Sequence, residues 1–233
     1  MYPILEAHPL TIFIVMAAML VTPFHLFATF AFSGASLKKG ALLASLTLVC
    51  GAAMFLVCFA NVPGRLGIAG NFIVPVAWIL PSLILYFARD WALAEALSSK
   101  WLIGLQIWRA IGAVFLIEMV RGNLPGIFAY PAGIGDVVVA IVALAVLVRF
   151  RDLEEIPARA IHLVGVLGVL DFISAFFFGF TSSDTPLQLF SHANPNQTIL
   201  FPTGLIPLFL VPYAIFFHVL AWLNLKKELE VRS

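Results

Sequence analysis

The sequence predicts an all-α fold, a polytopic transmembrane bundle of seven helices, and three observations lead to this prediction. Of the 233 residues, 62% are apolar and only 11% are charged, whereas about 25% of the residues in soluble domains are charged. The mean hydropathy is +1.06. Long apolar stretches recur along the whole chain, and a bilayer core about 30 Å thick needs about 20 apolar residues per helix.

The first three expected spans lie near residues 9–32, 40–62 and 68–88, and none of them contains Asp, Glu, Lys or Arg. The first span resembles the apolar part of a signal peptide. The residues before it contain Glu6 and no Lys or Arg, so we expect it to remain in the mature protein. The third span contains Pro75, which a membrane helix tolerates.

The last four expected spans lie near residues 101–121, 131–150, 159–180 and 199–225. The fourth is the most polar, because it carries Gln106, Arg109 and Glu118. The fifth and sixth carry one carboxyl group each, those of Asp136 and Asp171. The seventh contains three prolines, which remove backbone donors and are expected to kink the helix.

The basic residues test the span count without using hydropathy, because cytoplasmic loops hold an excess of Lys and Arg. With seven spans, the side opposite the N-terminus holds ten basic residues: Lys38, Lys39, Arg89, Lys100, Arg149, Arg151, Arg159, Lys226, Lys227 and Arg232. The other side holds only Arg65 and Arg121. A six-span alternative, with the fourth stretch lying on the surface, would remove this asymmetry. We therefore expect the N-terminus outside, the C-terminus in the cytoplasm and one membrane domain over residues 1–233.

Arg109 and Asp171 are expected near the middle of their spans. An ionisable side chain there costs at least about 2.5–3.5 kcal/mol and needs a partner or a water-filled cavity. Gln106 shares a helix face with Arg109, and Ser174 shares one with Asp171, because residues three apart lie on the same side. We expect both faces to point into the bundle, so that Arg109 and Asp171 meet. They either line a substrate, ion or proton path or only lock two helices together.

Asp136 follows two stretches rich in Gly and Pro, residues 122–126 and 131–135. Such sequences favour irregular backbone, so we expect Asp136 in the outer third of the fifth span. There it either lies at the mouth of the path, where it accepts backbone N–H groups or pairs with Arg121, or caps the helix start. Glu118 is expected to pair with Arg121, three residues further on.

Three histidines, His25, His162 and His218, fall at similar depths in three different spans. Imidazoles at one level could hold haem or a metal ion. No metal-binding spacing accompanies them, so no cofactor is predicted and haem or metal remains the alternative. The segment 181–198, which includes Asp184, His192 and Asn194, is a candidate lid.

Several short stretches in the second half of the chain carry a family resemblance: Gln106-Ile-Trp-Arg109, Gly122-Asn-Leu-Pro125, Pro131-Ala-Gly-Ile-Gly-Asp136, Phe201-Pro202, Leu205-Ile-Pro207, Leu210-Val-Pro212 and His218. Over residues 101–226 the chain resembles a group of uncharacterised bacterial seven-span membrane proteins. The resemblance implies a location in the bacterial cytoplasmic (inner) membrane. It supplies no activity.

Three functions remain open. The first is a small channel or secondary transporter that moves protons, ions or a small solute past Arg109 and Asp171. The second is an accessory or assembly subunit of a larger membrane complex, and the third is a membrane-embedded redox or lipid-acting enzyme. The expected partner is the lipid bilayer, with a homo-oligomer or larger complex possible in principle. With a net charge of +1, the composition gives no indication of the basic surface that nucleic-acid binding requires, so no nucleic-acid partner is expected.

Overall fold

The computed structural model describes residues 6–92, 97–190 and 195–232, and over these residues the secondary structure is entirely helical. The elements in chain order are α1 (Pro9–Phe32), α2 (Leu37–Phe59), α3 (Val62–Arg65), η1 (Gly67–Phe72), α4 (Ile73–Phe87), α5 (Arg89–Ala92), α6 (Ser99–Gly104), η2 (Leu105–Ala113), α7 (Val114–Val120), α8 (Gly126–Arg149), α9 (Ala158–Thr181), η3 (Ile206–Leu210) and α10 (Val211–Arg232). Both η1 and η2 are 3₁₀ helices, and η3 is a π-helix.

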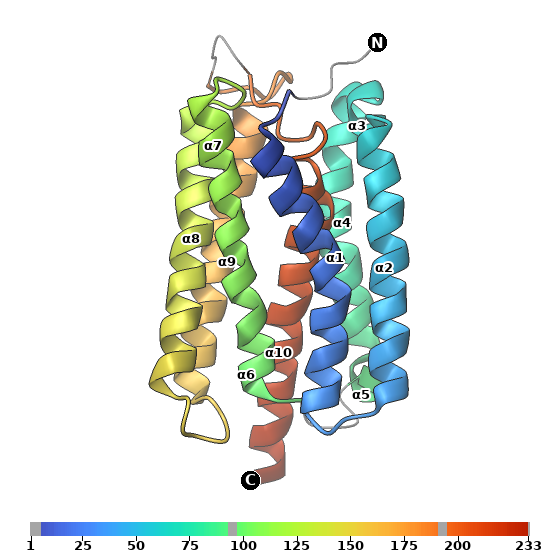
Figure 1. Cartoon of the computed structure of the whole chain (residues 1–233), viewed down its shortest axis with the longest axis vertical. Helices are drawn as coiled ribbons and strands as arrows, with labels where there is room; N and C mark the ends of the chain where they lie inside the picture. Colours follow the sequence, from blue (N-terminus) through green and yellow to red (C-terminus); the bar gives the residue numbers. More distant parts are fainter. Residues whose placement is uncertain (1–5, 93–96, 191–194, 233) are drawn as a thin grey trace.

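The long helices run up and down along one axis (Figure 1). We call the end at which α1 begins the upper end, and the end at which α10 finishes the lower end. α6, η2 and α7 follow one another as a single rod, and so do η3 and α10. Among the described residues, six rods are long and apolar enough to cross a membrane, and α4 is a shorter apolar helix beside them.

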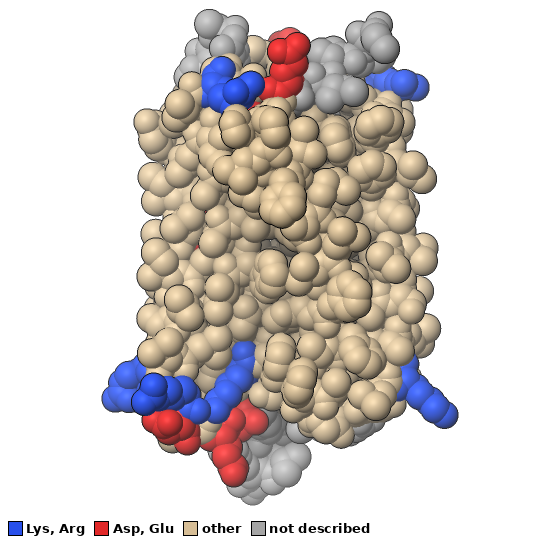
Figure 2. All heavy atoms as spheres, in the orientation of Figure 1, with Lys and Arg blue, Asp and Glu red and all other residues tan. Residues whose placement is uncertain are grey.

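The surface of the bundle is suited to contact with lipid. In Figure 2 the charged side chains gather at the two ends of the molecule, and a wide belt between them shows other residues. Large apolar side chains are exposed in this belt, including Phe24, Leu46 and Ile84. Soluble monomers rarely expose contiguous apolar patches larger than a few hundred Å². The chain is therefore an integral membrane protein built from several helices able to span a bilayer.

Four helix boundaries differ from the prediction by five residues or more. α8 begins at Gly126, five residues before the expected 131. The predicted irregular backbone is present over residues 122–125, but the prediction is wrong for residues 131–135, which are helical. Pro131 is accommodated because Pro is tolerated within membrane helices. The last rod begins at Ile206 instead of residue 199, and turns occupy residues 198–204. α4 begins at Ile73, five residues after the expected 68, because the 3₁₀ helix η1 occupies residues 67–72, and α10 continues to Arg232, seven residues beyond the expected 225. The remaining helix boundaries lie within three residues of the expected ones.

The proline positions show how the helices satisfy their backbone carbonyls. Pro23 has no N–H to offer the carbonyl of Met19, and the Thr22 hydroxyl donates to that carbonyl instead, at 3.0 Å. In the π-helix, the i→i+5 donor for the Pro207 carbonyl would be the backbone nitrogen of Pro212, which carries no hydrogen. The Trp78 indole of α4 donates to this carbonyl at 2.7 Å, which connects α4 to the last rod.

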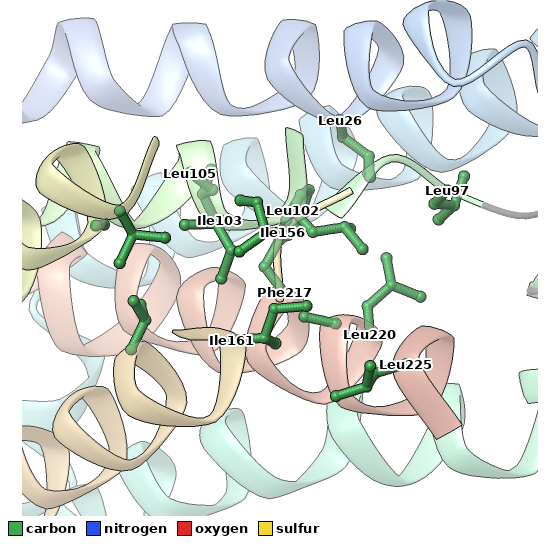
Figure 3. Close-up of a cluster of buried hydrophobic side chains, with 14 of the residues drawn as sticks. Leu26, Leu97, Leu102, Ile103, Leu105, Ile156, Ile161, Phe217, Leu220 and Leu225 are labelled. Carbon is green, nitrogen blue, oxygen red and sulfur yellow. The ribbon is translucent and has the colours of Figure 1, made fainter. Parts of the chain in front are cut away.

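The apolar interior consists of two clusters. The lower cluster packs side chains of α1, α6, α8, α9 and α10 (Figure 3), including Leu26, Leu102, Ile161, Phe217 and Leu220. The upper cluster includes residues of α1, α2, α7, α8 and η3. A layer of buried polar and charged side chains lies between the two clusters.

Candidate functional site

The centre of this layer is Arg109, which η2 places in the middle of the bundle with its side chain only 4% exposed. Its Nε donates to Asp136 Oδ1 of α8 at 2.8 Å, and its Nη2 donates to Asp171 Oδ2 of α9. Its Nη1 donates to the Gly168 carbonyl at 3.3 Å. The structure thus brings Arg109 and Asp171 together, as the sequence predicts, and adds Asp136 to the pair.

Asp136 is where the prediction was wrong. Since α8 begins at Gly126, Asp136 lies near the middle of this 24-residue helix and cannot cap its start. Its partner is Arg109, not Arg121. The carboxyl groups of Asp136 and Asp171 also lie close enough to interact with each other. One guanidinium therefore serves two buried carboxyl groups.

Three glycines, one on each helix of the site, give the charged groups their space. A Cβ at Gly112 would overlap the carboxyl group of Asp136, and one at Gly135 would overlap that of Asp171. A Cβ at Gly168 would collide with His218 and with Arg109 Nη1. Gly112 lies three residues after Arg109 and Gly168 three residues before Asp171, so each lies on the helix face of its charged residue. Gly135 was missed, because nothing in the sequence marks it as the neighbour of a carboxyl group from another helix.

Two rings complete the surroundings of Arg109. The Phe172 ring lies 3.8 Å from the guanidinium carbon, a cation–π contact. His218 Nε2 of α10 lies 3.5 Å from Arg109 Nη1. Because a guanidinium has only donors, Nε2 is the acceptor in this contact and the imidazole is neutral. Phe172 was not identified from the sequence, since one Phe among 22 carries no distinguishing signal.

Gln106 and Ser174 take less part in this site. Gln106 is buried and its Nε2 donates to the Ala214 carbonyl at 3.4 Å, which joins η2 to α10. Its Oε1 has no hydrogen-bond partner among the residues that the structure describes. Ser174 is half-buried on α9.

The three histidines do not gather. His25 lies within 3.1 Å of the Trp101 carbonyl, His162 bonds the Ala158 carbonyl from an exposed position, and His218 faces Arg109. Within residues 6–92, 97–190 and 195–232, no three His, Cys, Asp or Glu side chains are placed to hold a metal ion.

Glu118 is more buried than expected. The i,i+3 contact with Arg121 exists at 3.9 Å, yet Glu118 is fully buried and accepts three shorter hydrogen bonds. Thr11 Oγ1 donates at 2.5 Å, the His8 backbone N–H at 2.9 Å and Asn123 Nδ2 at 2.7 Å. Glu118 therefore attaches the start of α1 to the upper end of α7.

A cavity of about 90 Å³ leads from the upper end of the bundle to the two carboxyl groups. Ser183, Asn196 and Thr198, which belong to the segment expected to form a lid, line its upper part. Residues 191–194 of that segment, which include His192 and Asn194, lie outside the described residues. Asp136 and Asp171 line the inner part. A second cavity of about 30 Å³ reaches Arg109 and Asp136 from the side of α1.

These features define a class of protein: a helical, multi-pass membrane protein with an ion-paired layer buried at mid-depth. A family model described as a domain of unknown function, DUF8737, matches residues 66–226. The match covers more than half of the chain, so the chain belongs to this family. The residues that carry the family resemblance, within 101–226, lie inside the match. No curated protein and no solved structure matches the chain.

Proposed function

We propose that the chain crosses the membrane seven times, with its N-terminus outside and its C-terminus in the cytoplasm. α4 supplies the seventh crossing, because α4 and η1 together extend about 34 Å. Lys38, Lys100, Arg149 and Arg159 begin or end helices at the lower end, whereas Arg65 and Arg121 lie at the upper end, and the basic end is the cytoplasmic one.

This orientation can be tested by labelling from one side. With both native cysteines replaced by serine, a single cysteine at Asp184 should react with an impermeant maleimide in intact cells. A single cysteine at Asp152 should react only after lysis. Labelling of position 152 in intact cells would reverse the orientation.

We further propose that the protein is a secondary transporter for protons, ions or a small solute. The observation that supports this proposal is the cavity that extends from Asn196 and Thr198, near the upper end, down to Asp136 and Asp171. Below these carboxyl groups, the lower cluster packs side chains such as Phe217 and Leu102 to nearly complete burial. A cavity above the buried charges, with closely packed apolar side chains below them, suits a carrier that opens to one side at a time and does not suit an open channel.

The charges of the site give the carrier something to bind. Arg109 balances one carboxylate, so with both Asp136 and Asp171 ionised the layer has one unbalanced negative charge. An unbalanced buried charge is costly, and a bound proton or cation removes it. Asp171 Oδ1 is buried without a hydrogen-bond partner among the described residues, which marks this carboxyl group as a position for the proton.

The backbone near the site offers a hinge. Arg109 lies within the 3₁₀ segment η2, and the π-helix η3 contributes Ile206 and Pro207 to the cavity wall. Mid-helix 3₁₀ segments and π-bulges concentrate at functional sites and hinges. Bending at these two segments would open the lower cluster and close the upper cavity.

The test is flux into liposomes that contain the purified protein. We expect the wild type to carry protons or small ions down an imposed gradient, as read by a trapped pH dye and by ion-selective electrodes. Asp171→Asn should abolish the flux. Asp152→Asn makes the same change at an exposed surface position and should leave the flux unaltered. Absence of wild-type flux for any ion tested, or full flux in Asp171→Asn, contradicts a transport role.

A further inference from the structure

The large cavity has a chemical character that narrows what it can bind. Six aromatic side chains line it, contributed by α4, α7, α8 and α9: Trp78, Phe115, Phe128, Phe172, Phe176 and Phe180. Trp78 contacts Phe172 and Phe176, with ring centroids 5.9 Å and 5.7 Å apart, and Phe115 contacts Phe128 at 5.2 Å. Aromatic rings thus enclose the space from two opposite groups of helices.

The inner part of the cavity is negative, and its entrance is polar. Asp136 and Asp171 share one guanidinium, so the inner part attracts a single positive charge. Ser183, Asn196 and Thr198 at the entrance offer hydroxyl and amide groups. A cation enclosed by aromatic rings gains cation–π attraction in addition to its attraction to the carboxylates, and quaternary ammonium groups are typical ligands of such cages.

The volume sets a limit on size. A cavity of about 150 Å³ holds one benzene molecule, and this cavity measures about 90 Å³. The enclosed part of a ligand must therefore have fewer heavy atoms than benzene, about the four of a trimethylammonium group, and a cation with an aromatic ring exceeds this limit.

From this combination we propose that the cavity binds a small alkylammonium cation of the trimethylammonium type. The ammonium group lies near Asp171 and Asp136 among the aromatic rings. This inference rests on the proposed transport function and names its substrate class.

The experiment measures binding of radiolabelled choline to the purified full chain in lipid nanodiscs, by equilibrium dialysis. Choline has an uncharged analogue of the same shape, 3,3-dimethyl-1-butanol, in which carbon replaces nitrogen. We expect saturable binding of one choline per chain. An excess of 3,3-dimethyl-1-butanol should not displace the bound choline, whereas an excess of unlabelled tetramethylammonium should displace it. Displacement by the analogue at equal concentration, or no saturable choline binding, overturns the proposal.

Variants assign the binding to this cavity. Asp171→Asn should weaken choline binding at least tenfold, and Trp78→Leu, which leaves the charges in place, should weaken it about 2-fold to 30-fold. Asp152→Asn is the matched control and should bind like the wild type. If Asp171→Asn does not fold, the choline binding of Trp78→Leu decides whether this cavity is the binding site. Unchanged binding in Trp78→Leu contradicts the aromatic cage.

The two proposals can fail separately. Asp171-dependent ion flux in liposomes without choline binding would overturn the alkylammonium assignment and leave the transport function standing. Choline binding without any flux would overturn the transport function and leave the alkylammonium assignment standing. The protein would then be a binding protein instead of a carrier.

Discussion

Replacing Arg109 with Met should be among the most destabilising single changes in this chain. The substitution removes the donors to Asp136 Oδ1, to Asp171 Oδ2 and to the Gly168 carbonyl, and nothing polar takes their place. Removing one partner of a buried ion pair costs about 3–5 kcal/mol, because the other charge is left buried and uncompensated. We expect Arg109→Met to lower the free energy of unfolding by this amount.

The assay is reversible unfolding in mixed micelles with increasing SDS, followed by circular dichroism. Arg149→Met removes the same charge from an exposed position at the lower end of α8 and should change the free energy by no more than about 0.5 kcal/mol. A loss below about 1 kcal/mol for Arg109→Met would refute the reasoning, because the two carboxyl groups would then not depend on the guanidinium.

A compensating variant separates charge from shape. Combining Arg109→Met with Asp136→Asn and Asp171→Asn leaves no net charge in the layer. Buried ion pairs can often be replaced by neutral groups of similar volume without loss of stability. The triple variant should therefore be more stable than Arg109→Met alone, in the same SDS assay. If it is less stable, packing of the guanidinium, not its charge, holds the helices together.

Two further predictions concern the neighbours of this layer. Gly135→Ala should cost about 1–3 kcal/mol in the same unfolding assay, because its Cβ would overlap Asp171, whereas Gly104→Ala meets nothing closer than 3.9 Å and should be close to neutral. Equal stability of the two variants would mean that Asp171 does not lie against α8. Glu118→Gln should cost about 1–3 kcal/mol, since hydrogen bonds to a buried carboxylate are stronger than those to an amide. Hydrogen exchange of the first turn of α1 should become faster in this variant, and unchanged exchange there would argue against the Glu118 attachment.

The long helices could be predicted because bilayer thickness alone fixes their length. The first predicted span coincides with α1, and the sixth differs from α9 by one residue at each end. The fifth was misplaced because Gly126 and Pro131 normally interrupt helices in water. Within a membrane, backbone groups without a partner are too costly, so the helix continues through such residues.

The candidate site could be predicted only in part. Arg109 and Asp171 were identified because isolated charges in apolar spans are rare and need partners. The error over Asp136 followed from the misplaced helix start: a shift of five residues moves a side chain about 7.5 Å along the axis. The aromatic cavity wall could not be predicted, since Phe side chains facing lipid and Phe side chains facing a cavity look alike in sequence.

An ion pair that only locks helices together differs from a transport site in what surrounds it. A lock is most effective when it is packed on all sides. Here Asp136 lines two cavities, of about 90 Å³ and 30 Å³, on different sides of the layer. A dry void of 90 Å³ would cost about 2 kcal/mol, a loss that an ion pair with a purely structural role would not require. These cavities give a ligand or water space beside the buried charges, and they favour transport over a structural lock.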